Sequence, residues 1–259
     1  MLKSLPDLIE RITNRRELRR WRIFAARSTA AAAHPTELKL IRTRARQLKP
    51  HLDEALRHTD ERLGLPLVGS KLFPTPLGTD WSWRPDLWRV PLLRVGMAAV
   101  ANESSLGDQV KLYHDCARSE LSLRQIRNLR ESDLAPFGLM MDVFAFDGSF
   151  LSLVINMPET AVSGLRKTHL MRVALHTEVE QPIDIFVRLN IVHGPNTEQI
   201  VRELPRDSGD PFVEFDLAYT QLNEKRVERA WIDLIFEGPQ MNQVILRDLT
   251  FARCPRAAF

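Results

Sequence analysis

Residues 183–193 read Ile-Asp-Ile-Phe-Val-Arg-Leu-Asn-Ile-Val-His, and their alternation decides the fold class. One face of an extended chain receives the apolar members, which are Ile183, Ile185, Val187, Leu189 and Ile191. The other face receives Asp184, Arg188 and Asn190. Because successive side chains of a strand point to opposite faces of the sheet, this pattern predicts a β-strand with one buried and one polar face.

Runs of the same kind recur along the chain from about Val110 onward. They cover residues 141–155, 170–179, 213–219, 230–236 and 244–251, with turn residues between them and no helical pattern. Strands that repeat this often without crossover helices predict an antiparallel, jelly-roll-like β-sandwich.

Two hairpins are predicted within this sandwich. Asp147–Gly148 interrupts residues 141–155 and suits the positive φ angles of a two-residue turn. Residues 170–179 are predicted to pair with residues 183–193 through the intervening Glu-Gln-Pro, with Val179 opposite Ile183.

The second hairpin, if it forms, gathers polar side chains on one exposed sheet face. Its register places Arg172 opposite Asn190 and brings His176 and Arg188 to the same face, with His193 at the margin. Sugar hydroxyls need paired donors and acceptors, and sugar C–H faces stack on aromatic rings. The face therefore indicates glycan binding, with a solvated outer face as the alternative interpretation.

The N-terminal segment differs in charge and in period. Residues 1–62 carry 15 Lys/Arg and 8 Asp/Glu, a net charge of +7, whereas the remainder carries 21 and 25, a net charge of −4. Apolar residues at helical spacing predict helices, first at Leu5, Leu8, Ile9 and Ile12, then in a heptad-like seam of Leu38, Ile41, Ala45, Leu48, Leu52 and Ala55. Pro50 predicts a kink or a new helix start, and Gly64 predicts the helix end.

The predicted organisation is α+β, mainly β: a basic α-helical arm (1–63), a Pro/Trp-rich strap (64–91) and a β-sandwich domain (92–259). Three roles for the arm stay open. Arg15, Arg16, Arg19 and Arg20 favour an anionic surface, such as a membrane or nucleic acid, although no specific nucleic-acid motif is present. The seam favours a homo-oligomer, and packing on the sandwich is the third role.

The strap carries five prolines and three tryptophans, Trp81, Trp83 and Trp88. Such a stretch is extended and is predicted to lie against the following domain as its first strand. Trp81 and Trp83 are two residues apart and would share a strand face. They either pack at the edge of the sandwich or form a stacking platform for a sugar ring or an unpaired base.

The sequence predicts no catalytic residue, no cofactor and no metal site. It lacks the phosphate-loop, dinucleotide-binding, serine-elbow and His-Glu-x-x-His patterns. In His114–Asp115–Cys116, Cys116 is either a buried structural thiol, the favoured interpretation, or a nucleophile. Cys116 and Cys254 alone form no disulfide framework. Without an uninterrupted apolar stretch of signal-peptide or membrane-spanning length, the prediction is a cytoplasmic protein that is not transmembrane.

Two resemblances add to these patterns. Residues 141–253 resemble the jelly-roll sandwiches of carbohydrate-binding modules and galactose-binding-like domains, through Phe-Asp-Gly-Ser-Phe near the predicted turn and Val-Ile-Leu-Arg-Asp-Leu-Thr-Phe in the last run. The whole chain is similar to an uncharacterised alphaproteobacterial family of unknown function. The first resemblance implies a sandwich that binds glycans and supplies no ligand residues.

The leading hypothesis is a non-catalytic binding protein whose sandwich recognises a glycan or similar polar ligand, with Arg172, His176, Arg188, Asn190, His193, Trp81 and Trp83 as candidate ligand-binding residues. The alternative is a structural or adaptor protein that binds a protein partner and oligomerises through the arm. A hydrolase with an unrecognised active site is the third class.

Overall fold

A computed structural model describes residues 5–29, 34–68, 73–130, 132–205 and 211–256. The chain divides into two compact units, Met1–Leu56 and Arg57–Phe259. Two long helices, α1 (Leu5–Thr29) and α2 (Pro35–Val68), come first in the chain. Pro35 begins α2, where its fixed φ suits the first helical position. The predicted domain boundaries at residues 63 and 91 stay predictions.

Helix α2 is longer than the sequence predicts. It runs without interruption through Pro50 and Gly64 to Val68, so the alternative helix start at Pro50 and the predicted end at Gly64 are both wrong. Relative to alanine, a proline inside a helix costs about 3 kcal/mol and a glycine about 1 kcal/mol. The remaining turns of this 34-residue helix offset these costs. A kink at Pro50 stays a prediction. No helix of the described residues has the length and apolar character needed to cross a membrane.

The first unit holds contacts between α1 and α2. Trp21 and Phe24 are half-buried in an edge-to-face pair with ring centroids 5.5 Å apart, and they line one groove with Leu48 of α2. Arg27 also donates a hydrogen bond to Glu37 across the two helices (3.0 Å). Leu48 remains 37% exposed, so part of the heptad-like seam faces solvent and self-association through it stays a prediction.

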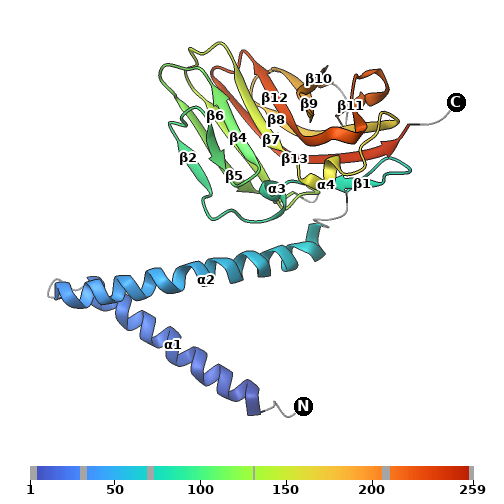
Figure 1. Cartoon of the computed structure of the whole chain (residues 1–259). Helices are drawn as coiled ribbons and strands as arrows, with labels where there is room; N and C mark the ends of the chain where they lie inside the picture. Colours follow the sequence, from blue (N-terminus) through green and yellow to red (C-terminus); the bar gives the residue numbers. More distant parts are fainter. Residues whose placement is uncertain (1–4, 30–33, 69–72, 131, 206–210, 257–259) are drawn as a thin grey trace. The chain divides into compact units, whose positions relative to one another are not determined.

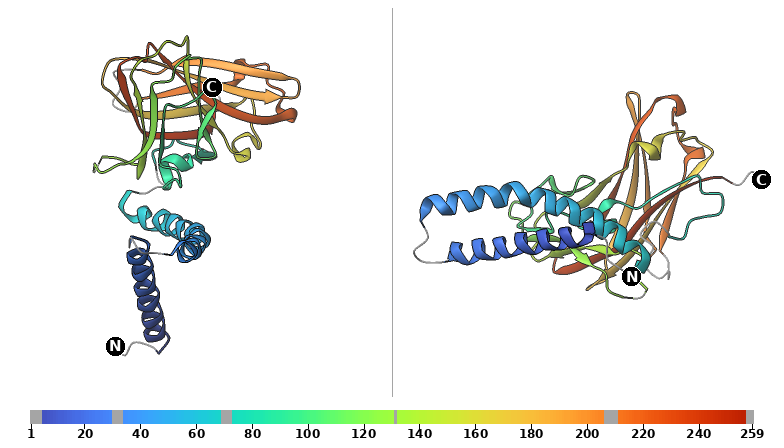
Figure 2. Two further views of the ribbon diagram at one scale, coloured as in Figure 1. Left: turned by 90° about the vertical axis from the view of Figure 1, so that its left-hand side faces the viewer. Right: turned by 90° about the horizontal axis from the view of Figure 1, so that it is seen from below.

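The second unit contains an antiparallel β-sandwich, which confirms the predicted class (Figure 1). Its seven-stranded sheet runs β11 (Phe212–Asp216), β8 (His169–Val179), β13 (Asn242–Pro255), β6 (Phe137–Val143), β5 (Leu121–Arg127) and β2 (Gly96–Ala98), with β1 (Trp81–Trp83) paired to β13. The six-stranded sheet runs β10 (Asn196–Glu203), β9 (Asp184–His193), β12 (Val227–Glu237), β7 (Leu151–Asn156), β4 (Val110–His114) and β3 (Ser104–Leu106). The short helices are α3 (Asp86–Arg89), α4 (Glu159–Val162), η1 (Leu217–Tyr219) and η2 (Glu224–Arg226). Figure 2 shows the sheets from two further directions.

The core lies between the two sheets. The apolar face of β9 is buried as its alternation predicts, from Ile183 to Ile191. Strand β13 differs, because residues 248–254 are all buried and alternation disappears. This strand is central in its sheet, with β8 along one side and β6 and β1 along the other.

The predicted hairpin at Asp147–Gly148 is wrong. Strand β6 pairs with β5 and β13, whereas β7 pairs with β4 and β12 in the other sheet. Gly148 does not have a positive φ. Its role is close approach, because a Cβ there would lie 2.6 Å from Asp115 Oδ1. The Ser149 amide donates to the same oxygen (2.6 Å). Asp147–Gly148 therefore belongs to the loop that connects the two sheets, and Asp115 holds this loop in place.

The predicted pairing of residues 170–179 with residues 183–193 is also wrong. Val179 pairs with Val244 of β13, and β9 lies in the opposite sheet between β10 and β12. The tight turn in this region is instead the one between β9 and β10, where His193 pairs with Asn196 across two residues. The first of them, Gly194, has a φ of +62°, as a type II′ turn requires.

Candidate functional site

The outer face of the six-stranded sheet contains a depression of about 550 Å³. Strands β4, β7, β9, β10 and β12 supply its lining, together with Phe150. Two cross-strand rows form the floor. The first runs Gln199, Asn190, Trp231, Asn156, and the second runs Arg188, Asp233, Val154, Lys111. Side chains in such rows contact their neighbours directly.

A hydrogen-bonded network joins these two rows. Asp233 Oδ2 accepts hydrogen bonds from Arg188 Nε (2.6 Å) and Asn190 Nδ2 (3.0 Å). Asn190 Oδ1 in turn accepts from Gln199 Nε2 (3.0 Å). Asn190 is fully buried and Asp233 is 2% exposed. Because a buried carboxylate is stable only when it is paired, these contacts hold the polar floor in a fixed geometry.

Aromatic rings lie beside the network. Trp231 and Tyr113 are half-buried, and Phe150 is exposed at the margin. The guanidinium of Arg229 lies 5.4 Å from the ring centroid of Trp231. The depression therefore combines ring surfaces with fixed donors and acceptors.

One hydroxyl in the depression lacks a partner. Ser152 is 6% exposed, and its Oγ is buried without a hydrogen bond to any residue that the structure describes. Leaving a buried polar group unsatisfied costs about 1–3 kcal/mol.

The structure brings only two of the proposed polar residues together. Arg188 and Asn190 lie in the depression. Arg172 and His176 lie on β8, in the other sheet, where Arg172 donates to Glu214 (2.8 Å). His193 is 3% exposed, and its Nδ1 accepts a hydrogen bond from the Asn223 amide (3.3 Å). A single face carrying all five is therefore wrong, because the predicted hairpin does not form.

None of the strap tryptophans lines this depression: Trp81 and Trp83 lie on β1 of the seven-stranded sheet, and Trp88 lies on α3. Trp81 and Trp83 share a strand face as predicted, with ring centroids 6.4 Å apart. Trp83 packs on the buried Phe251 (5.1 Å), and Trp81 Nε1 donates to Thr160 Oγ1 (3.1 Å). Trp88 is fully buried. These contacts agree with the interpretation that the tryptophans pack against the sandwich.

The His114–Asp115–Cys116 triplet has structural contacts. His114 is buried with Nε2 2.8 Å from the Val100 carbonyl oxygen. The Ser149 hydroxyl holds the pKa of Asp115 below its usual value by hydrogen bonding. Burial raises the pKa of the Cys116 thiol, which opposes nucleophile activation. Cys116 and Cys254 are both free thiols. Within the described ranges, no three His, Cys, Asp or Glu side chains are arranged to hold a metal ion.

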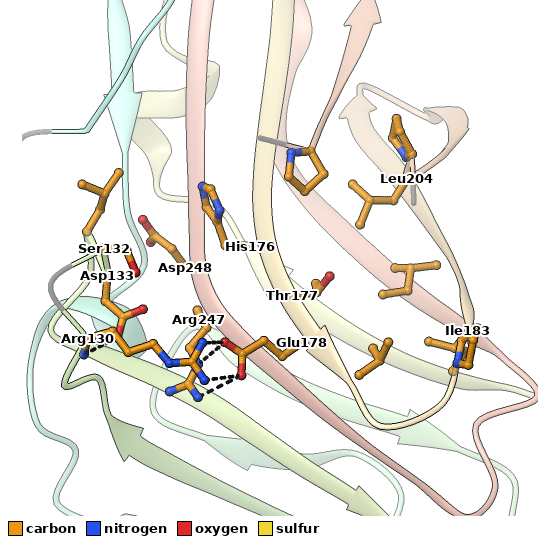
Figure 3. Close-up of a pocket in the computed structure, with 16 residues that line it drawn as sticks. Arg130, Ser132, Asp133, His176, Thr177, Glu178, Ile183, Leu204, Arg247 and Asp248 are labelled. Atoms are coloured by element: carbon orange, nitrogen blue, oxygen red, sulfur yellow. Dashed lines mark hydrogen bonds and ion pairs between the residues drawn. The ribbon is translucent and has the colours of Figure 1, made fainter. Parts of the chain in front are cut away.

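A second cavity of about 790 Å³ lies where β8 and β13 approach β9 (Figure 3). Glu178 accepts hydrogen bonds from both Arg130 and Arg247 on its polar wall. The bonds from Arg247 hold the pKa of Glu178 low, and Glu178 raises the pKa of Arg247. Arg130 and Arg247 therefore already pair with the carboxylate of Glu178. Pro205 and Pro211, also in the lining, flank residues outside the described ranges, so the depression on the six-stranded sheet is the stronger candidate site.

Sequence reasoning missed several residues of this site. Trp231 and Asp233 alternate with the buried Ile232 and Leu234 in a run that was recognised as a strand. Their outward positions were therefore a usable signal. Gln199 gave no such signal, because β10 is a mostly exposed edge strand without apolar alternation.

Comparisons with known proteins concern the family and the fold. A family model described as "Family of unknown function (DUF6478)" matches residues 1–259. No curated protein matches the sequence.

Several solved structures share a similar fold at low sequence identity. The family 11 carbohydrate-binding module from Clostridium thermocellum, in complex with a mixed-linked tetrasaccharide, is 11% identical with a TM-score of 0.37, over 63% of this chain and 99% of that chain. The C-terminal family 22 module of Clostridium thermocellum Xyn10B is 8% identical with a TM-score of 0.37, over 72% of this chain and 100% of that chain. The enzymatically active domain of Bacteriophage CBA120 tailspike protein 4 is 8% identical with a TM-score of 0.40, over 59% of this chain but 21% of that chain. These likenesses concern the fold alone.

Proposed function

The chain belongs to the DUF6478 family of unknown function, and we propose that it is a non-catalytic protein that binds a glycan in the depression on its six-stranded sheet. The observation that carries this proposal is the network of Arg188, Asn190, Gln199 and Asp233 beside the ring of Trp231. Binding sites for small polar molecules combine apolar and aromatic surfaces with a few placed polar groups.

The chemistry of the depression suits a sugar. Its amides and guanidinium offer donors and acceptors that are held in place before any ligand arrives, which lowers the entropy cost of binding. Trp231 and Tyr113 supply ring faces for the C–H surface of a pyranose.

The single carboxylate in the lining supports binding rather than hydrolysis. Glycoside hydrolysis ordinarily uses two carboxylic groups on either side of the scissile bond. Asp233 is the one carboxylate among the lining residues, and both Arg188 and Asn190 already donate to it. A buried carboxylate that already accepts two hydrogen bonds is poorly placed to act as an acid or a nucleophile.

Replacing Trp231 tests the site directly. We expect Trp231→Ala to weaken glycan binding by about 10- to 100-fold, roughly 1.4–2.7 kcal/mol, because it removes the ring on which a sugar C–H face would stack. A glycan array identifies the ligand, and calorimetry measures both proteins. Trp81→Ala is the matched control, since Trp81 is also half-buried but lies in the other sheet, and its affinity should equal that of the wild type. Equal losses in the two variants would refute this site.

A second role is proposed for α1. Residues 15–29 contain six arginines and one acidic residue. Arg15, Arg19 and Arg22 fall at i, i+4 and i+7 on one exposed stripe, and none has an ion pair within the described part of the chain. Trp21 turns toward α2 instead. This stripe supports the predicted attachment to an anionic surface.

Vesicle binding tests the arginine stripe. We expect the chain to sediment with phosphatidylcholine vesicles only when they contain phosphatidylserine. Changing Arg15, Arg19 and Arg22 to Gln should weaken this binding by more than about 100-fold, since each basic residue near such a surface contributes about 1 kcal/mol. Changing the same three to Lys retains the charge and should preserve binding. If the Gln variant binds as the wild type does, the stripe is not the attachment surface.

A further inference from the structure

The depression carries an excess of positive charge. Lys111, Arg188 and Arg229 line it, against one carboxylate, Asp233, which gives a net charge of +2. Arg188 is bound to Asp233 through Nε and Nη2, both 2.6 Å from Oδ2. The excess therefore belongs to Lys111 and Arg229.

Neither of these two cations is neutralised by the protein. In the portion of the chain that the structure covers, the side chains of Lys111 and Arg229 have no ion pair and no hydrogen bond, and Arg229 contacts the face of Trp231. Elsewhere in the same unit, Arg84, Arg172 and Arg247 each have a carboxylate partner. Arg94 and Arg118 also lack an ion pair among the described residues, but Lys111 and Arg229 are the unpaired cations that line the depression.

The side chains of Lys111 and Arg229 extend from backbone positions that are further apart than the width of one sugar ring. Lys111 lies opposite Val154, which lies opposite Asp233, and Arg229 is four residues from Asp233 along β12. Two strand spacings and four residues correspond to roughly 16 Å between the two Cα atoms. Trp231 lies beside the line between them. A ligand that pairs with both cations while each side chain extends outward from its own position carries negative charge on more than one sugar unit.

The rest of the face restricts where such an oligomer lies. In the row of Ile235, β10 carries Glu203, and beyond this row β12 carries Glu237. These carboxylates form an acidic end of the same sheet face. They repel an anionic chain, so an acidic ligand is confined to the part of the face between Arg229 and Lys111.

We infer that the ligand of this depression is an acidic oligosaccharide, with uronate or sulfate groups that pair with Lys111 and Arg229. The inference rests on the proposed function and specifies the class of glycan. The network around Asp233 binds sugar hydroxyls, Trp231 stacks on a ring, and the two cations select the charged chain over its neutral counterpart.

An array carrying neutral, uronate-containing and sulfated oligosaccharides, probed with the full chain, tests the class of ligand. We expect the binders to be acidic. Calorimetry should show at least about tenfold weaker binding of the matched neutral form, prepared by methyl esterification or desulfation. Binders confined to neutral glycans would overturn this inference and leave the proposed function standing. Binders in no class would overturn both.

A charge variant tests the two residues. Lys111→Gln with Arg229→Gln should weaken binding of the acidic glycan by at least about tenfold and reduce its salt dependence, while affinity for the matched neutral form stays the same. The control is Arg94→Gln with Arg118→Gln, which makes the same change in net charge at exposed residues outside the depression. If both double variants lose affinity equally, or neither does, the assignment of the charge to Lys111 and Arg229 is overturned.

Discussion

We expect Asp248→Ala to lower the free energy of unfolding of the β-sandwich by about 3–5 kcal/mol. Asp248 accepts two hydrogen bonds from Arg84, at 2.8 Å from Nε and 2.7 Å from Nη2. Their side chains are 6% and 1% exposed. Removing the carboxylate takes from the buried Arg84 guanidinium the counter-charge to which both of these hydrogen bonds are donated. Urea unfolding followed by tryptophan fluorescence measures the change.

Two control variants distinguish the cost of leaving a buried charge without its partner from the cost of losing an ion pair. Glu214→Ala breaks the partly exposed pair with Arg172 in the same sheet and should cost no more than about 1 kcal/mol. Replacing both members of the buried pair, Arg84→Met with Asp248→Leu, removes the guanidinium together with the carboxylate, and this double variant should be more stable than Asp248→Ala. A cost of Asp248→Ala no larger than that of Glu214→Ala would contradict the prediction.

We expect a loss of similar size from Trp88→Ala. Trp88 on α3 is fully buried, and its Nε1 donates to the carbonyl oxygen of Leu246 on β13 (2.9 Å). Truncating a buried tryptophan costs about 3–5 kcal/mol, because it removes apolar contacts and leaves a cavity. Chemical unfolding followed by near-ultraviolet circular dichroism measures this loss.

Comparison with two other tryptophan variants shows what Trp88 contributes. Trp88→Phe retains most of the ring and loses the donor to Leu246, so it should cost about 1–3 kcal/mol. Trp81→Ala, at a half-buried position in β1, should cost less than Trp88→Ala. An unchanged unfolding midpoint for Trp88→Ala would mean that α3 is not part of the core.

The alternation of apolar and polar residues in the sequence identified the buried strand faces correctly, but it did not identify which strands pair. The positions from Ile183 to Ile191 are buried as expected. The same alternation would appear whether β9 paired with the preceding strand or with distant β12, so it contains no information on partners. The turn prediction at Asp147–Gly148 failed for a related reason. Glycine is needed there because Asp115, which follows another strand, approaches closely, and the sequence of a turn alone does not show such a distant contact.

The candidate site could be predicted only in part, because its residues meet through tertiary pairing. Arg188 and Asn190 were recognisable as polar residues on the outward face of one strand. Their partner Asp233 is 43 residues from Asn190 in sequence, and its position beside them depends on the register between β9 and β12. The unpaired state of Lys111 has no sequence signature at all, since it follows from the register that places the apolar Val154 opposite Lys111.

The position of β13 has a consequence for how the protein is synthesised. β13 is the last strand in chain order, yet it lies between β8 on one side and β6 and β1 on the other. Until the ribosome has released it, β6 and β8 have no common neighbour and each presents an unpaired edge. Closing such sequence-distant pairings is slow, and open edges invite association between nascent chains. The seven-stranded sheet therefore closes only after β13 has been synthesised, and a chain that ends before residue 242 keeps both edges open.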